Sequence, residues 1–167
     1  MMATYYGHRQ GGMPTPWGQA DSQIKVASGV YEVCTPGHGG IMVGKAIART
    51  HLSPAALRIG EPFGAYLAYE EDCAYAAVYA DRPDWYRAAC EAGALDDELA
   101  AQAEAERGEF YPMRSATDEQ IGGYFRAIAV QWFPAAYRLP VPDGAGWKTL
   151  PRKEMEHVGS SNTETAE

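Results

Sequence analysis

The chain has 167 residues, of which 46% are hydrophobic and 22% are charged. This composition is typical of a globular protein, and the length suits one domain with a substantial core. The formal net charge of −8 argues against direct binding to nucleic acid phosphates, because such proteins need clustered Lys and Arg. The same charge is compatible with a protein partner that carries a basic surface.

Membrane and secretion signals are both missing from the sequence. No apolar run approaches the ~18 residues of a membrane span, and the first ten residues lack the apolar core of a secretory signal. We therefore expect no membrane association and a cytoplasmic location. The cysteines show no Cys-x-x-Cys spacing, which predicts reduced thiols rather than disulfides at Cys34, Cys73 and Cys90.

Composition divides the chain into three parts. Residues 1–13 are predicted to form an irregular N-terminal arm, and residues 143–167 a polar, disordered C-terminal tail. Residues 14–142 between them are predicted to form a single α+β domain. Trp17 lies in an otherwise polar stretch, so we expect its ring to pack against that domain.

The first part of the domain carries β-strand signals. Residues 23–27 and 30–34 flank the pair Ser28-Gly29, which is a plausible tight turn of a hairpin. A third short strand is predicted at residues 41–43, after a glycine-rich turn. These segments predict a small antiparallel sheet of about three strands.

The rest of the domain is predicted to be helical, with four or five helices packed against the sheet. The last helix is the clearest, because Thr117 to Gln120 has the pattern of a capping box and Pro134 marks the end. One apolar stripe on it is formed by Ile121, Phe125, Ile128, Ala129 and Trp132. The predicted helices cover residues 53–57, 66–79, 84–91, 96–107 and 117–133.

One carboxylate occupies an unexpected position in this pattern. If residues 66–79 form a helix, Glu70 falls near the middle of its apolar arc. A buried carboxylate needs a partner, a raised pKa or an open cleft above it. We therefore predict that Glu70 is largely buried and has a polar partner, and the first candidate is His38. The turn that carries His38 should include a glycine with positive φ among Gly37, Gly39 and Gly40.

These residues also define the candidate catalytic site. Cys34, His38 and Glu70 have the residue types of a nucleophile, a base and an orienting acid. Their spacing matches no known nucleophile signature, so a structural pairing of His38 with Glu70 is favoured over catalysis. No paired metal-ligand spacing occurs among His38, His51, Glu70, Asp72 and Cys73, so we predict neither a metal nor a cofactor.

The candidate partner-binding residues lie further along the chain. The stretch from residue 91 to residue 109 holds seven acidic residues and one basic residue, Arg107. Such a run is usually a solvated helix face, and the sharper alternative is a surface for a basic partner. Tyr75 and Tyr79 point away from the apolar arc of their predicted helix, so we also predict one exposed aromatic patch, which would favour binding. The residues predicted to bind a partner are Asp96, Asp97, Glu98, Glu104, Tyr75 and Tyr79.

Three short segments occur in a fixed order, namely Thr15-Pro16-Trp17-Gly18, Thr35-Pro36-Gly37-His38-Gly39-Gly40-Ile41 and Tyr69-Glu70-Glu71-Asp72-Cys73. Together they resemble an uncharacterised domain family of bacteria and their phages and plasmids. The resemblance covers roughly residues 14–90 and implies a candidate site without a reaction. It also implies a mobile-element setting, in which small acidic proteins often block host defence.

Two functions remain open from the sequence. The first is a small acidic mobile-element protein that binds and inhibits a host defence or nucleic-acid-handling protein by occupying its basic surface. The second is a small hydrolase-type enzyme that uses His38 and Glu70, with or without Cys34. The incomplete catalytic set favours the first, and no pattern specifies an oligomeric state.

Overall fold

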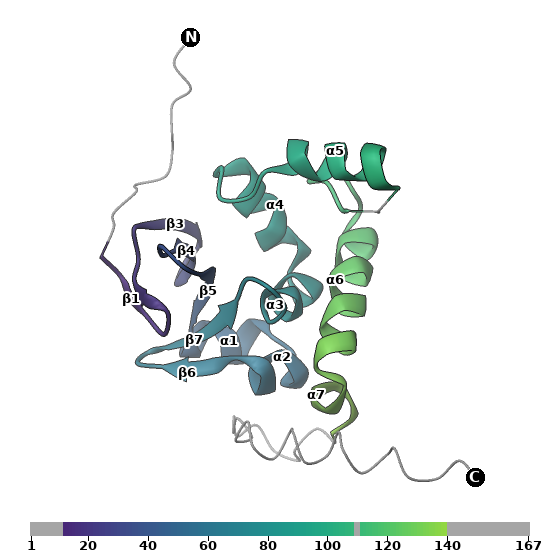
Figure 1. The fold of residues 1–167 in the computed structure, drawn as a ribbon. Helices are drawn as coiled ribbons and strands as arrows, with labels where there is room; N and C mark the ends of the chain where they lie inside the picture. The colour runs from purple at the N-terminus through teal and green to yellow at the C-terminus, as the bar shows by residue number, and fades with distance from the viewer. Residues whose placement is uncertain (1–11, 109–110, 140–167) are drawn as a thin grey trace, which may run out of the picture.

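The computed structural model describes residues 12–108 and 111–139, and these residues form a mixed α+β fold (Figure 1). The predicted tail and residues 1–11 of the predicted arm lie outside them. The strands are β1 (Pro14–Thr15), β2 (Gly18–Gln19), β3 (Ser22–Ala27), β4 (Val30–Cys34), β5 (Gly39–Gly44), β6 (Glu61–Phe63) and β7 (Tyr66–Glu70). The helices are α1 (Lys45–His51), α2 (Pro54–Ile59), α3 (Tyr75–Asp81), α4 (Pro83–Glu91), α5 (Asp97–Arg107), α6 (Asp118–Trp132) and α7 (Pro134–Arg138).

The main sheet has five antiparallel strands in the order β3-β4-β5-β7-β6, and β1 and β2 form a separate hairpin. The predicted hairpin is confirmed, with Gly29 at a φ of 70° in its turn. The predicted third strand is confirmed as β5. The prediction of about three strands was too small, because it missed β6 and β7. Seven helices in the described ranges likewise exceed the four or five predicted.

The largest error concerns residues 66–79, which do not form one helix. The first five residues form β7, a turn follows, and α3 begins at Tyr75. Strand β7 lies between β5 and β6 and is buried at Leu67, Ala68 and Tyr69, so both of its faces are covered. A strand buried on both faces has a continuous apolar run, which periodicity cannot distinguish from a buried helix.

The other helices follow their sequence signals. Ser53 caps α2 by accepting a hydrogen bond from the Ala56 amide at 3.3 Å, as the Ser-Pro pattern predicts. The capping box at the start of α6 is confirmed by reciprocal bonds between Thr117 and Gln120. Helix α1, directly after β5, was not among the predicted helices.

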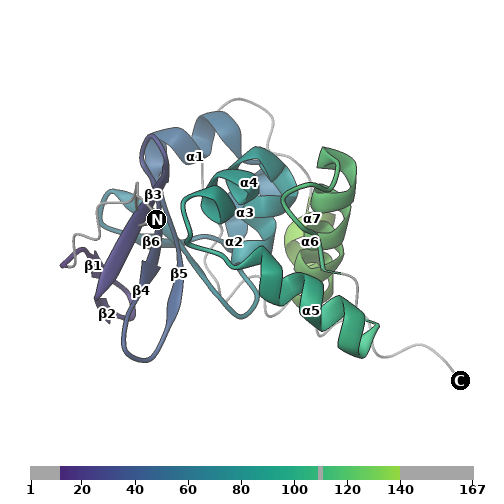
Figure 2. The same cartoon turned by 90° about the horizontal axis from the view of Figure 1, so that it is seen from above.

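The main core lies between the sheet and the helices. Figure 2 shows the strands on one side of the molecule and α3, α4 and α6 on the other. Phe125 of α6 is fully buried, and aromatic rings from α3, α4, the segment before α6 and α6 itself surround it. Its partners lie with ring centroids 5.1–6.4 Å away and are Tyr75, Tyr79, Tyr86, Tyr111 and Tyr124.

This packing corrects two sequence expectations. Tyr79 is 1% exposed and Tyr75 is partly buried, so they do not form the predicted exposed aromatic patch. Both rings point into the core because α3 packs against α6 instead of standing at the surface. Trp132 was expected on the buried stripe of α6, yet it is 61% exposed because it lies in the last turn of the helix.

Candidate functional site

The three sequence segments that define the resemblance meet on the outer face of the sheet, where β5 and β7 pair. Gly40 of β5 is paired with Glu70 of β7, and the ring of Trp17 lies over Gly40. A side chain at Gly40 would bring its Cβ within 2.2 Å of the Tyr69 carbonyl oxygen and 2.7 Å of the Trp17 ring. Gly40 has a φ of 157°, which confirms the predicted positive-φ glycine. Only glycine fits this crossing of three segments.

His38 and Glu70 are brought together on this face, as predicted. His38 Nδ1 lies 3.7 Å from Glu70 Oε1, and the hydroxyl of Thr35 closes the turn by donating to the His38 carbonyl at 2.7 Å. The predicted burial of Glu70 is met only in part, since its side chain is half-buried at 26% exposed, and that of His38 is 56% exposed. Glu70 ends a strand instead of lying inside a helix, so water reaches its carboxylate.

Cys34 does not join this pair. It is paired with Gly39, whereas Glu70 is paired with the next residue, Gly40. Side chains of consecutive strand residues point to opposite faces of a sheet. Cys34 therefore faces the helices while Glu70 faces outward, and the proposed Cys34–His38–Glu70 set is not assembled.

A different thiol lies near Glu70. Cys73 Sγ is 3.8 Å from Glu70 Oε2, and burial together with the nearby carboxylate raises the pKa of the Cys73 thiol. Burial also raises the pKa of the Glu70 carboxyl. A nucleophilic cysteine needs a lowered pKa next to a cationic group, and this environment acts in the opposite direction.

The helix-covered face carries a second polar region that sequence patterns did not identify. An open cleft of about 280 Å³ lies where the ends of β3 and β4 meet the start of α3 and the residues before and after α5. Two carboxylates, one thiol and two phenol rings reach it. Its lining comprises Ser22, Ile24, Glu32, Val33, Cys34, Gly40, Glu71, Tyr75, Ala94, Leu95 and Tyr111.

Glu32 is the most unusual residue of this cleft. It stands in register with Ile24 and Ile41, so its side chain points toward the helices and the core. The buried hydroxyl of Tyr79 donates a hydrogen bond to Oε1 of Glu32. Burial raises the pKa of the Glu32 carboxyl to about 7, and the negative charge of Glu71 adds to this effect. A signal existed in the sequence, because strand alternation places Glu32 on the same face as Val30.

Glu71 supplies the second carboxylate from the rim of the cleft. It is exposed, and its amide donates to the Gly39 carbonyl at 3.0 Å, which extends the pairing of β5 and β7 by one residue. A Cβ on Gly39 would lie 2.6 Å from Glu71 Oε2. The missing side chain of Gly39 therefore leaves the space that the Glu71 carboxylate occupies. Adjacent residues Glu70 and Glu71 thus serve opposite faces of the sheet.

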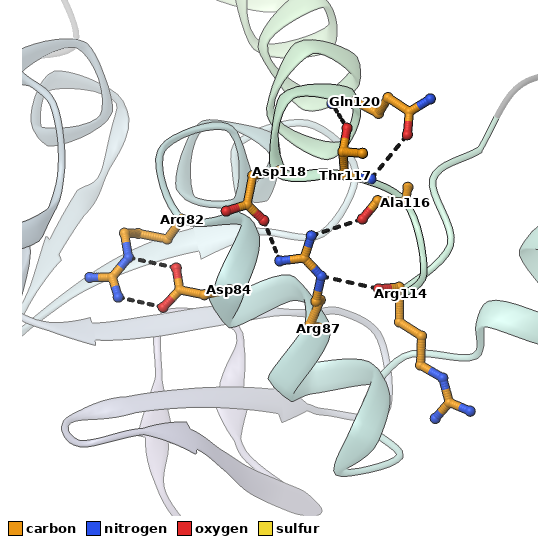
Figure 3. Close-up of polar contacts among 8 residues, drawn as sticks. All are labelled: Arg82, Asp84, Arg87, Arg114, Ala116, Thr117, Asp118 and Gln120. Carbon is orange, nitrogen blue, oxygen red and sulfur yellow. Dashed lines mark hydrogen bonds and ion pairs between the residues drawn. The ribbon is translucent and has the colours of Figure 1, made fainter.

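Helix α4 holds the segment that carries Tyr111. The hydroxyl of Tyr86 donates to the carbonyl of Pro112, and Arg87 donates to the carbonyls of Arg114 and Ala116 at 3.1 and 2.8 Å. Arg87 also forms an ion pair with Asp118, as Figure 3 shows. These bonds fix residues 111–118 against α4, and so they position one side of the cleft.

The acidic residues of the predicted partner surface have different environments. Asp97 pairs with Arg114 at 3.3 Å and is 24% exposed, whereas Asp96 before α5 is exposed. Glu104 on α5 is half-buried, and the side chain of Glu98 lies outside the described part. The acids therefore do not form one uniform free face. Part of their charge is used to attach α5 to the segment before α6.

The described residues contain neither a metal site nor a membrane-spanning helix. In residues 12–108 and 111–139, no three His, Cys, Asp or Glu side chains are grouped so that they could hold a metal ion. His51 instead packs edge-on against Trp85, with ring centroids 6.0 Å apart. No helix within these same ranges has the length and apolar character needed to cross a membrane.

Comparison with known proteins places the chain in a family. No curated protein and no solved structure matches it significantly. A family model described as a domain of unknown function (DUF7007) matches residues 10–139, which covers the whole described fold. The chain therefore belongs to the DUF7007 family of domains of unknown function.

Proposed function

We propose that the protein acts by binding a protein partner with a basic surface, at fixed stoichiometry, through the acidic region around α5 and the adjoining cleft. The mobile-element setting that its motifs imply suggests the partner class, a host defence or nucleic-acid-handling protein. Occupation of the basic surface of such a partner would inhibit it. The sequence supports this with 22 acidic residues against 14 Lys and Arg.

One observation carries the proposal. Ala94 and Leu95, which connect α4 to α5, line the cleft that contains Glu32 and Glu71. The residues that lead into α5 therefore lie beside two carboxylates from other parts of the chain. Figure 1 shows α5 beyond the start of α6. A basic surface that contacts α5 would lie close to the cleft as well.

A hydrolase-type activity is the second candidate, and the proximity of His38 to Glu70 favours it. The pair lies on the outer face, separated from Cys34 by the sheet, and the Cys73 thiol has a raised pKa. The pair by itself supplies a general base, which would act on a water molecule or on a separate nucleophile. Binding therefore accounts for more of the arrangement than catalysis does.

Charge reversal on α5 tests the binding proposal. The immobilised protein captures partners from a host lysate, and association rates with the captured protein are then measured at low and high salt. The double variant Glu104→Lys/Glu106→Lys should slow association by about tenfold at low salt, because steering by opposite charges is reduced. The difference in association rate between this variant and the wild type should shrink at high salt, because the charges are screened.

A matched control raises the net charge by the same amount elsewhere. Glu61→Lys, Ala65→Lys and Gln131→Lys together change exposed positions outside α5. This triple variant should retain most of the association rate. Equal slowing by both variants would show that only the net charge matters. If binding is unchanged in both variants and His38→Ala loses activity, the hydrolase-type activity would replace the binding proposal.

A further inference from the structure

We propose that the cleft between Glu32 and Glu71 is a receptor site for one cationic side chain, a lysine or an arginine, that the partner inserts. This inference rests on the proposed function, because it assumes a partner with a basic surface. It goes further by assigning the contact to a defined cavity, to two carboxylates and to the chemical class of the ligand.

The two carboxylates of the cleft have no counterion among the described residues. Glu32 and Glu71 both line the cleft, one on its inner side and one at its exposed rim. Within the described residues, no Lys, Arg or His forms an ion pair with either carboxylate. The hydroxyl of Tyr79 is the hydrogen-bond donor to Glu32 there, and it is a neutral group. A cation from outside would supply the missing opposite charge.

The remaining walls of the cleft are mostly apolar or aromatic. Ile24 and Leu95 offer apolar surface, and Tyr75 and Tyr111 offer phenol rings. A lysine or arginine side chain has a long apolar stem and a charged end, so it fits a cleft with apolar sides and acidic groups. Aromatic rings also attract cations directly. A volume of about 280 Å³ is enough for one such side chain, and it lies below the usual range for sites of drug-sized ligands.

The protonation state of Glu32 makes this site sensitive to pH. The Glu32 carboxyl has a pKa of about 7 in the free protein, and a bound cation favours its charged form. Affinity for the cationic side chain should therefore rise by about tenfold or more from pH 5.5 to pH 8, because the fraction of protein with a charged Glu32 increases. The titratable groups around Glu32 are Glu71, Tyr75, Tyr79, Cys90 and Tyr111.

Short peptides test the site directly in the full chain. The probe is N-acetyl-Gly-Lys-Gly-amide, with an arginine version and a norleucine version that keeps the apolar stem and lacks the charge. NMR titration at pH 8 should show saturable shifts at Leu95 and Tyr111 with the lysine or the arginine peptide, and the stronger of the two identifies the preferred cation. The norleucine peptide should produce at most a tenth of that affinity.

Neighbouring carboxylates supply matched variants. Glu32→Gln and Glu71→Gln should each weaken the cationic peptide at least fivefold, and Glu32→Gln should also remove the pH dependence. Glu70→Gln changes the residue next to Glu71 on the opposite face of the sheet, so it should leave peptide binding unchanged. Glu71 is exposed, so its variant tests the site even if a change at Glu32 disturbs folding.

The outcomes separate this inference from the proposed function. Equal binding of the norleucine peptide, absence of binding by both cationic peptides, or equal loss in Glu70→Gln would overturn the receptor site. Slow association of the α5 variant together with no peptide binding would leave the proposed function standing without this site. Peptide binding in a protein whose α5 variant associates normally would keep the site and reject α5 as the docking surface.

Discussion

The two faces of the sheet each hold a half-buried carboxyl whose pKa is raised by burial, and the two differ in their partners. Glu70 on the outer face is 26% exposed and has His38 beside it. Glu32 on the helix-covered face has no ionic partner among the described residues, and burial raises its pKa to about 7. Burial thus raises the pKa of a carboxyl on each face, but among the described residues only the outer-face carboxyl, Glu70, has a histidine beside it.

This difference suggests different roles for the two faces. On the outer face the motif residues solve a packing problem, because Trp17 crosses Gly40 at a distance that no side chain allows. On the helix-covered face, burial disfavours the charged form of the Glu32 carboxyl, which lines the cleft. Groups kept at the expense of stability are concentrated at functional sites.

The largest expected effect is on the free energy of unfolding, and it tests the structural role of the outer face. Gly40→Ala should destabilise the fold by about 3 kcal/mol or more, because its Cβ would lie 2.2 Å from the backbone oxygen of Tyr69. Gly37→Ala in the same turn is the control and should change stability by less than about 0.5 kcal/mol, since no atom lies within 4 Å of its Cβ. Chemical denaturation measures both, and a neutral Gly40→Ala would remove the packing explanation for the motifs.

The second effect concerns Glu32 and is pH-dependent. The folded carboxyl titrates near pH 7, whereas the unfolded group titrates near pH 4.5. Between these values the folded protein keeps a proton that the unfolded chain has lost, so stability falls as pH rises from about 4.5 to about 7. Glu32→Gln should therefore stabilise the protein by up to about 3 kcal/mol at pH 8 and by almost nothing at pH 4.

Thermal or urea unfolding of the wild type and of Glu32→Gln at pH 8 and at pH 4 measures this stabilisation. Glu70→Gln is the comparison on the other face, and it should give a smaller gain, because its carboxylate is partly hydrated and lies beside His38. A larger gain for Glu70→Gln than for Glu32→Gln would invert the contrast between the two faces.

The sequence was sufficient for elements whose signals are local. The turn at Ser28-Gly29, the capping box at Thr117 and the glycine turn before β5 all depend on short-range geometry, and each is confirmed. Residues 66–70 needed non-local information, because a strand covered on both faces shows no alternation. Without β5 and β6 as neighbours, this apolar run has no feature that prevents a helical interpretation.

The candidate site was predicted only in part, again because non-local strand pairing decides it. Pairing of His38 with Glu70 was predicted correctly, although from a wrong helix, and Cys34 was added wrongly. The face to which a strand residue points depends on register, which the sequence does not display. Glu32 could have been noticed from alternation within residues 30–34. Glu71 joins it only because the Glu71 amide bonds to the Gly39 carbonyl, one residue beyond the end of β7.

The third effect tests the bond that holds Glu32 in place. Tyr79→Phe removes the hydroxyl that donates to Glu32 and leaves the buried ring in the aromatic cluster. We expect a loss of about 2 kcal/mol at pH 8, when the carboxylate is charged, and of about 1 kcal/mol at pH 5. Denaturation at the two pH values measures the difference. A loss that does not depend on pH would mean that this bond does not report the charge of Glu32.

The smallest expected effect is at His38. Its ring is largely exposed and lies 3.7 Å from the Glu70 carboxylate, so the pair should contribute at most about 0.5 kcal/mol. His38→Ala should therefore leave the unfolding free energy within that margin, and a double-mutant cycle with Glu70→Gln should find little coupling. If partner binding also stays unchanged, the outer face serves the fold alone. A variant that remains folded and loses all function would instead make His38 a functional residue, and the difference between the faces would then lie in exposure and not in role.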